Sequence, residues 1–295
     1  MLIWAAAGIA VKEALLLFTP LILIVLRFSL AVIFMLLIGL TFRGNKVIGL
    51  QRVEKKDIPL FMLGGLLQPF LYFIFETYTY QSFASPTIAE AMLSTQPVLA
   101  PIFAFLLLRE RVTRNNILGI LLSTIGMLLL LLVGSDTFSL GSPWGVLLAI
   151  VTVSMSVSYS VVLRRIPTHY SSLSIVFYVQ SFSLILFYVV WMIMGEASTL
   201  FYNAAQLVQN TTQFLHSGAA VLYLAVFASV AAFVLFCYTV REIGVTRANV
   251  FNNVRPVFTA LLMWLIFDEV LPIWKLIGII IIIIGLFISQ KVGKR

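Results

Sequence analysis

Two stretches of this sequence decide its fold. Residues 85–126 read SPTIAEAMLSTQPVLAPIFAFLLLRERVTRNNILGILLSTIG, and residues 244–285 read GVTRANVFNNVRPVFTALLMWLIFDEVLPIWKLIGIIIIIIG. They align without a gap, and the alignment pairs Pro97 with Pro256, Glu110 with Glu269, Gly119 with Gly278, and Gly126 with Gly285. A proline, a glutamate and two glycines that match at one offset indicate an internal duplication.

The whole chain is as apolar as these stretches. Of its 295 residues, 61% are hydrophobic and 10% are charged, and the mean hydropathy is +1.09. Soluble domains are about half apolar and about a quarter charged, so this composition indicates a membrane protein. A run of about 20 apolar residues can cross a bilayer as a helix. We predict ten such spans, near residues 2–18, 20–40, 58–80, 86–108, 115–133, 143–164, 172–194, 218–240, 246–267 and 272–290.

Most basic residues follow the even-numbered spans. They are Arg43, Lys46, Arg52, Lys55 and Lys56; Arg109, Arg111 and Arg114; Arg164 and Arg165; Arg241 and Arg247; and Lys291, Lys294 and Arg295. The loops that follow the odd-numbered spans contain no lysine or arginine. Because basic loops remain on the cytoplasmic side, we expect all of these clusters and both chain termini in the cytoplasm.

Each half of the duplication contains five spans, an odd number, so the second half crosses the membrane in the opposite sense. The predicted fold class is therefore an all-α polytopic membrane protein with ten transmembrane helices in two inverted five-helix repeats. The repeats cover residues 1–133 and 143–291, and residues 134–142 form an outer linker. Inverted repeats are typical of transporters, in which a central site opens alternately to each side.

Other functional classes find less support. Cys237 has no second cysteine to pair with, and His169 and His216 lie in loops on opposite sides, so we expect no disulfide, metal or cofactor. The formal charge of +8 lies in loops rather than in a basic stripe, so we expect no nucleic-acid partner. A channel or a non-transporting receptor remains the alternative to a transporter, and an intramembrane enzyme is less favoured because no catalytic set is evident.

The two quoted stretches resemble the EamA repeats of the drug/metabolite transporter superfamily. In that family a small-residue start, a mid-span proline, a glutamate at the end of the span and a glycine-bearing next span recur in each half. The resemblance implies a carrier of a small organic metabolite. The duplication predicts that it works by alternating access, and since the sequence shows no ATP-binding motif, we expect gradients or exchange to drive it. We expect it in a bacterial cytoplasmic (inner) membrane, in contact with lipid, as a monomer or homodimer, with export as the favoured direction.

Polar residues at matching positions of spans four and nine are the first candidates for substrate binding. They are Glu90 and Ser94 on span four, and Asn249, Asn253, Asn252 and Arg255 on span nine. The spacing of Glu90, Ser94, Pro97 and Pro101 predicts that these four residues share one helical face. Lipid offers no partner for such a face, so we expect it to line a cavity. The alternative is that these side chains join helices by hydrogen bonds.

Arg27 and Glu76 are further candidates, because ionisable groups within spans usually serve function. A structural ion pair between them is the alternative reading. Tyr78, Tyr80, Gln96 and Gln180 are weaker candidates. Arginine and glutamate together suit a zwitterion, so an amino-acid-like solute is favoured. Glu90 or Glu76 could couple its transport to protons.

Glu110 and Glu269 end spans four and nine, where the helix dipole disfavours a carboxylate. We expect each to be stabilised by the N-terminus of the next helix in the chain and to be structural. The four glycines matched by the duplication recur at every seventh residue, and we expect them to let helices pack closely.

Overall fold

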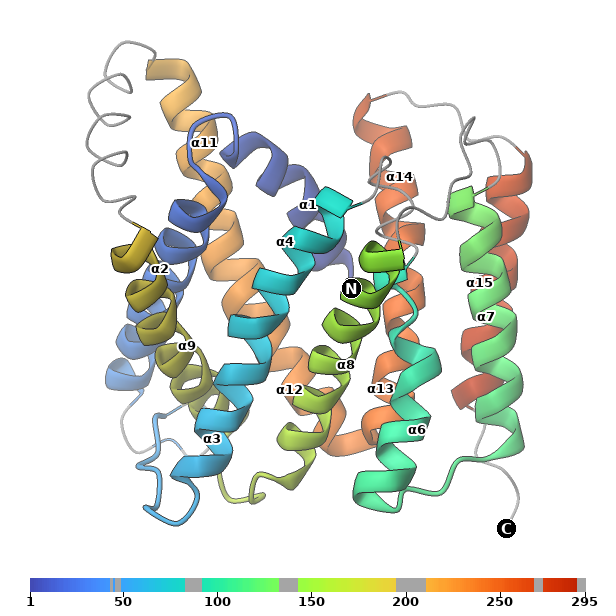
Figure 1. Ribbon diagram of the computed structural model, residues 1–295, viewed down its shortest axis with the longest axis horizontal. Coiled ribbons are helices and arrows are strands. Elements are labelled where there is room, and N and C mark those ends of the chain that lie inside the picture. The colour runs from blue at the N-terminus through green and yellow to red at the C-terminus, as the bar shows by residue number, and fades with distance from the viewer. Residues whose placement is uncertain are drawn as a thin grey trace. The chain divides into compact units, whose positions relative to one another are not determined.

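The computed structural model describes residues 1–42, 45, 49–82, 92–132, 143–194, 211–267 and 273–290. All regular elements in these residues are helices (Figure 1). They are α1 (Leu2–Ala14), α2 (Pro20–Thr41), α3 (Ile58–Gly65), η1 (Leu66–Leu71), α4 (Tyr72–Ser82), α6 (Gln96–Leu108), α7 (Arg114–Leu132), α8 (Pro143–Arg165), α9 (Ser172–Met194), α11 (Thr211–Tyr223), η2 (Leu224–Ala231), α12 (Ala232–Ile243), α13 (Val245–Val250), η3 (Phe251–Val254), α14 (Arg255–Phe267) and α15 (Ile273–Gln290). The segment η1 contains a kink at Gln68, whose backbone is extended (φ −150°, ψ 123°), whereas η2 is π-helical and η3 is a 3₁₀-helix.

Several of these helices have the length and composition of membrane spans. Within the described residues, six qualify: Pro20–Thr41, Ile58–Thr79, Pro143–Arg165, Ser172–Met194, Gln213–Ile243 and Ile273–Gln290. Leu2–Val11, Gln96–Leu108 and Arg114–Leu129 are shorter apolar helices. The predicted all-helical membrane class is therefore confirmed, and the total of ten crossings stays a prediction.

The helix ends follow from local chemistry. The hydroxyl of Thr19 accepts a hydrogen bond from the backbone N–H of Ile22 at 3.4 Å, and Pro20 begins α2, where its missing N–H has no consequence. The hydroxyl of Ser171 accepts from the N–H of Ser174 at 3.1 Å and caps α9 in the same way. Helix α6 ends at Arg109, which adopts a left-handed conformation with φ of 54°.

The chain divides into two compact units, and each takes segments from both predicted repeats. The first unit consists of Met1–Leu2, Leu71–Arg165 and Thr239–Arg295. The second unit consists of Ile3–Phe70 and Ile166–Tyr238. The predicted repeat boundaries at residues 133 and 143 therefore do not coincide with the limits of the compact units, and the repeat assignment stays a prediction.

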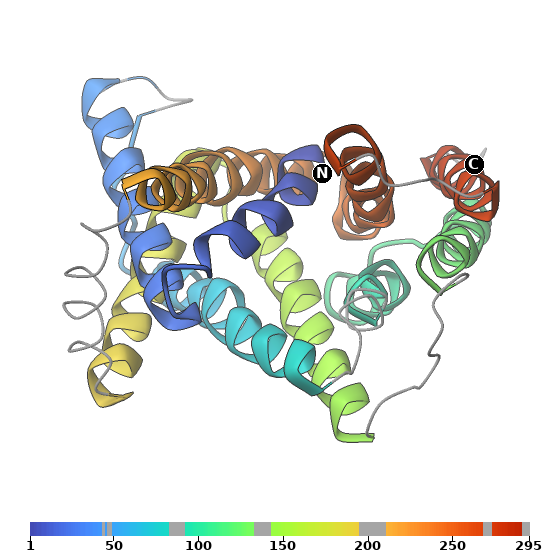
Figure 2. The same ribbon diagram turned by 90° about the horizontal axis from the view of Figure 1, so that it is seen from above.

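In the first unit, the corresponding helices α7 and α15 lie side by side and antiparallel (Figures 1 and 2). A β-carbon on Gly119 would lie 2.5 Å from the carbonyl oxygen of Gly285, and one on Gly126 would lie 2.7 Å from that of Gly278. The expected close packing at these glycines is confirmed. Because Gly119 corresponds to Gly278 and Gly126 to Gly285, exchanging the two repeats converts one contact into the other, as inverted repeats predict.

In the second unit, α2 packs against α9 and η2, and α3 packs against α9. Gly65 permits the latter contact, since a β-carbon there would lie 2.6 Å from the carbonyl oxygen of Val179. The hydroxyl of Ser183 donates to the carbonyl of Gly65 at 2.7 Å, and the indole N–H of Trp4 donates to the carbonyl of Ala228 at 3.1 Å. These bonds satisfy polar groups that lipid would leave without partners.

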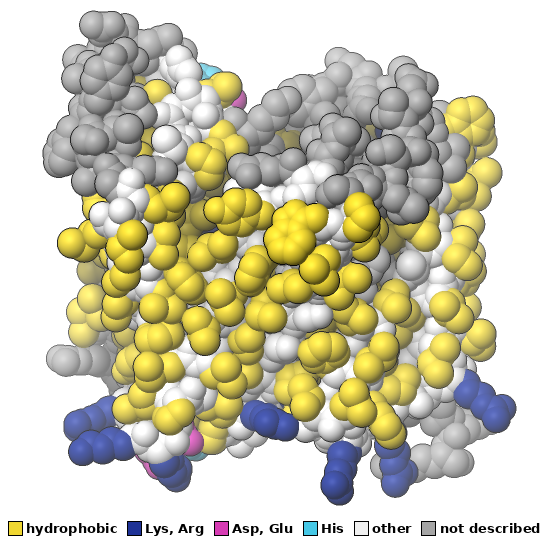
Figure 3. Space-filling model, viewed as in Figure 1, with side chains coloured by type: hydrophobic (Ala, Val, Ile, Leu, Met, Phe, Trp, Pro, Cys, Tyr) yellow, Lys and Arg dark blue, Asp and Glu magenta, His cyan; other side chains and the backbone are white. Residues whose placement is uncertain are grey.

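The surface has the pattern of a membrane protein. On the face that Figure 3 shows, apolar side chains predominate, and the lysine and arginine side chains gather apart from the main apolar surface. In the first unit, Arg165 donates to the carbonyl of Leu107 at 2.6 Å, and the N–H of Val245 donates to Glu110 at 3.2 Å. The ends of α6 and α8 and the start of α13 therefore meet at the end that carries this unit's basic clusters. The assignment of that end to the cytoplasm stays a prediction.

Candidate functional site

Spans four and nine are both interrupted, and at matching positions. In span four, the chain turns at Ser94 and Thr95 before α6 starts at Gln96. In span nine, η3 separates α13 from α14, which starts at Arg255. Each irregular segment directly precedes the residue before the shared proline, and the missing N–H of that proline removes one helical hydrogen bond. Both fourth helices of the duplication therefore depart from regular α-helical pairing within the apolar part of the chain.

The break corrects one prediction. Ser94 does not belong to the same continuous helix as Pro97 and Pro101, so their spacing does not place the three side chains on one helical face. The reason is the proline itself, whose effect on the preceding backbone outweighs the regular repeat of a helix. Glu90, the fourth residue of that predicted face, lies outside the described residues.

Three predicted site residues of the first unit form a chain of hydrogen bonds at the breaks. The side-chain amide of Asn252 donates to Oε1 of Gln96 at 2.6 Å and to Oδ1 of Asn249 at 3.2 Å. The amide of Asn249 donates in turn to the hydroxyl of Ser160 on α8 at 3.2 Å. Ser160 was not among the predicted residues. Asn249 and Ser160 are fully buried and Gln96 nearly so, so these polar groups meet inside the helix bundle.

Asn253 faces a different neighbour. Its amide nitrogen donates to the hydroxyl of Ser123 on α7 at 2.8 Å, and both residues are fully buried. Its Oδ1 is also buried and accepts no hydrogen bond from the described residues. Asn253 therefore joins helices, which was the alternative reading of this polar set.

Arg255 starts α14 and is half-buried. The N–H of Arg255 donates to the carbonyl of Asn252 in η3, so the helical backbone continues from η3 into α14. The guanidinium of Arg255 would stabilise an anionic group at this place. Ser94 is buried at the preceding break of span four.

In the second unit, Arg27 and Gln180 meet at one residue. Nε of Arg27 donates to the hydroxyl of Ser229 at 2.6 Å, and the amide of Gln180 donates to the carbonyl of Ser229, also at 2.6 Å. Ser229 lies in η2, where the π-helical ladder changes the backbone pairing. Oε1 of Gln180 is buried and accepts no hydrogen bond from the described residues. The pattern of the sequence does not single out Ser229.

Irregular segments of the third helices, the kink in η1 and the π-helical η2, also match between the repeats. At the offset of the two aligned stretches, η1 (Leu66–Leu71) falls on η2 (Leu224–Ala231). The third helix of each repeat is thus irregular at the same place, as the fourth helix is. π-Helical insertions are found frequently at functional sites.

The remaining predicted residues are Glu76, Tyr78 and Tyr80. Glu76 accepts a hydrogen bond from the hydroxyl of Tyr72 at 2.8 Å within α4. Its predicted pairing with Arg27 joins residues of different units and stays a prediction. Tyr78 is exposed, and the side chain of Tyr80 lies outside the described part of the structure.

Glu110 has a different partner from the one we predicted. Its carboxylate accepts from the backbone N–H of Val245 at 3.2 Å and of Thr246 at 3.5 Å, at the start of α13. It therefore stabilises a helix of the other repeat and not the next helix in the chain, because antiparallel packing brings the end of α6 to the start of α13. Gly244, with φ of +88°, leaves room for the carboxylate. Glu269 lies outside the described residues.

Comparison with known proteins places this arrangement in a family. A 28% identical protein, named uncharacterized transporter YetK of Bacillus subtilis, is aligned over 92% of this chain and 78% of its own length. An uncharacterized transporter of Archaeoglobus fulgidus is 20% identical over 98% of this chain and 95% of its own. One crystal structure has a TM-score of 0.73 at 20% identity, covers 98% of this chain and 94% of its own, and shows a similar fold. Residues 1–132 and 143–290 each match the EamA-like transporter family, and the chain therefore belongs to that family of transporters.

Proposed function

We propose that this protein carries a small organic metabolite across the membrane by alternating access, driven by a gradient or by exchange. The matching irregularities of the third and fourth helices support this proposal. Discontinuous helices that recur in inverted repeats are a common way to build a substrate site near the middle of the bilayer. The antiparallel contact of α7 with α15 supports the inverted relation on which alternating access depends.

The observation that carries the proposal is the hydrogen-bonded chain of Gln96, Asn252 and Asn249 at the breaks of spans four and nine. Amide side chains offer both donors and acceptors, so they can exchange bonds with each other for bonds with a polar solute. We propose that these residues, with Ser94 and Arg255, contact the substrate. Within a membrane such groups are costly unless they are paired, and a transported solute is a natural alternative partner.

An amino-acid-like solute fits these groups best. The guanidinium of Arg255 favours a carboxylate, and the oxygens of the amide side chains accept from an ammonium group. Arg27 in the second unit is a second candidate for a carboxylate, and export is the direction that we propose. Proton coupling through Glu76 or Glu90 belongs to the same proposal.

Transport in proteoliposomes tests the proposal. Purified protein is reconstituted, and exchange of labelled amino acids, sugars and organic cations is measured. Asn252→Ala should reduce exchange of the transported solute by about tenfold or more, since losing polar contacts inside a water-excluded site typically removes 1.4 kcal/mol or more, which is about a factor of ten.

Two serines of α8 provide a matched control. Ser160→Ala removes one of the two acceptors of the Asn249 amide, the other being the carbonyl of Val245, whereas Ser154→Ala removes only a bond to the carbonyl of Ile150 in the same helix. We expect Ser160→Ala to change the apparent KM and Ser154→Ala to leave exchange unchanged. Exchange that persists in Asn252→Ala for every transported solute, with the protein folded, would exclude this site.

A further inference from the structure

In the second unit, the loop before α3 lies on the turn between α8 and α9. The hydroxyl of Tyr170 accepts from the backbone N–H of Glu54 at 3.0 Å and donates to Oδ2 of Asp57 at 2.8 Å. The N–H of Ser171 donates to Oε1 of Gln51 at 2.5 Å. Tyr170 is almost fully buried, so it fixes the loop to the turn from below.

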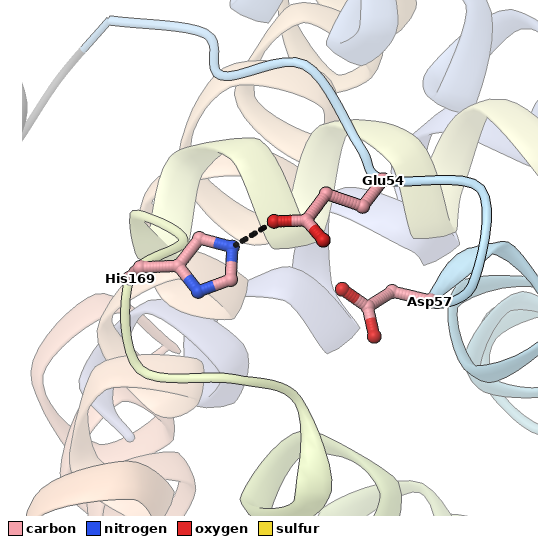
Figure 4. Close-up of side chains that lie close together, drawn as sticks. All are labelled: Glu54, Asp57 and His169. Atoms are coloured by element: carbon pink, nitrogen blue, oxygen red, sulfur yellow. Dashed lines mark ion pairs between the residues drawn. The ribbon is translucent and has the colours of Figure 1, made fainter.

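This contact brings together three side chains that can bind metal (Figure 4). Ligand atoms of Glu54, Asp57 and His169 all lie within 4.8 Å of one another. Nε2 of His169 lies 3.7 Å from Oε1 of Glu54. Asp57 precedes α3 but makes no capping hydrogen bond to it, so its carboxylate is turned toward Tyr170 instead of its own helix.

We propose that Glu54, Asp57 and His169 form a binding site for a divalent ion of the Zn²⁺ class. One imidazole nitrogen and two carboxylate oxygens suit zinc and its first-row neighbours better than Mg²⁺ or Ca²⁺, which prefer oxygen alone. Such an ion holds its ligands at about 2.0–2.2 Å, and small rotations of the half-exposed Glu54 and His169 side chains bring the ligands that close. Three protein ligands leave a position for water, as at an exchangeable site.

Packing around Asp57 fixes the positions of two of the three proposed ligands, Asp57 and Glu54. Tyr170 holds both the carboxylate of Asp57 and the backbone of Glu54, and residues bonded to ligands in this way orient them for a metal. The bound ion would join the loop to the turn that precedes α9. It would thereby connect segments of the two sequence repeats at one end of the second unit.

Lys56 is the group that opposes the ion. Its Nζ lies 2.7 Å from Oε2 of Glu54, and this hydrogen bond raises the pKa of Lys56. Arg52 and Lys55 add positive charge to the same loop. An ion at the site must therefore compete with Lys56 for Glu54. Since the Lys56 side chain is 71% exposed, it can turn into water when the ion binds.

Zinc titration of the purified full-length chain, freed of any histidine tag, tests the proposal. Binding of Zn²⁺ alone is followed by competition with a fluorescent zinc indicator, and by the midpoint of thermal unfolding. We expect one Zn²⁺ per chain and a raised midpoint. Even a residue that only orients a ligand changes metal affinity by about 10- to 100-fold, so His169→Ala and Asp57→Asn should each weaken binding at least tenfold.

Two control variants make the result specific. His216→Ala removes the second histidine of the chain, which is exposed on α11, and should leave the affinity unchanged. Lys56→Ala should strengthen binding severalfold, whereas Lys55→Ala should change it less. If His169→Ala fails to fold, His169→Gln with Asp57→Asn provides the same comparison. Zinc affinity that is unchanged in the variants of His169 and Asp57, or that falls equally in His216→Ala, would overturn the proposal.

Discussion

Replacement of Gly119 by alanine tests the close contact of α7 with α15. The new β-carbon would lie 2.5 Å from the carbonyl oxygen of Gly285, much closer than a normal van der Waals distance. This oxygen belongs to the backbone of a helix and cannot rotate away, so the two helices must separate. Adding a methyl group to a full contact destabilises by about 1–3 kcal/mol, and the rigid neighbour favours the upper end.

Helix propensity acts in the opposite direction. Alanine in place of glycine stabilises an unhindered helical position by about 1 kcal/mol. The expected net loss for Gly119→Ala is therefore about 2 kcal/mol, the difference between the overpacking and the propensity. Gly126→Ala, whose β-carbon would lie 2.7 Å from the carbonyl oxygen of Gly278, should lose a similar amount, because the two contacts are related by the repeat.

Gly218→Ala is the matched control. Gly218 is also helical, in α11, but a β-carbon there would meet no atom within 4 Å. We expect this variant to gain up to about 1 kcal/mol, so the two substitutions should differ in sign. Reversible unfolding in mixed micelles, followed by circular dichroism, measures the free energies. A Gly119→Ala protein as stable as Gly218→Ala would refute the packing argument and the repeat relation drawn from it.

Three further predictions concern polar groups. Glu110→Ala should destabilise the protein by about 1–2 kcal/mol, because the start of α13 loses its acceptor; a loss below about 0.3 kcal/mol in the same unfolding assay would contradict this role. Burial, together with donation to a carboxylate, raises the pKa of Tyr170 above its ordinary value of 10.0, so its contribution is complete below pH 10 and is lost as the pH rises through the folded-state pKa. A scan of unfolding midpoints against pH should therefore show an alkaline fall that is smaller in Tyr170→Phe. Ser229→Ala should lower stability by about 1–3 kcal/mol, because it leaves the buried Arg27 without one acceptor, and an unchanged unfolding midpoint would argue against that bond.

Much of the fold follows from the sequence alone. The predicted spans 143–164 and 172–194 agree closely with α8 and α9, because an apolar run in lipid must satisfy its own backbone hydrogen bonds and the helix does so locally. The duplication was likewise evident from a few matched residues, and it predicted that Gly119 and Gly126 make close helix contacts. The helical spans are predictable because they depend on residues nearby in the chain and on the surrounding lipid.

The breaks in spans four and nine were only partly predictable. The prolines at 97 and 256 are plain in the sequence, yet a proline within a span can start, kink or end a helix, and a helical repeat alone led us to place Ser94 on the face of Pro97. The uniformly apolar composition adds to the difficulty, since the inward and outward faces of a helix differ little in residue type. Glu90 and the side chain of Tyr80, both part of the predicted site, lie outside the described residues.

Only the tertiary structure decided which polar groups meet. Asn252 bonds to Gln96, Arg27 to Ser229, and Glu54 approaches His169, and each pair lies far apart along the chain. Sequence spacing relates side chains only within one helix, over three or four residues. Pairing between helices depends on how their surfaces pack, and many packings satisfy the same apolar pattern equally well, so the partners of buried polar groups emerge only when the chain is folded.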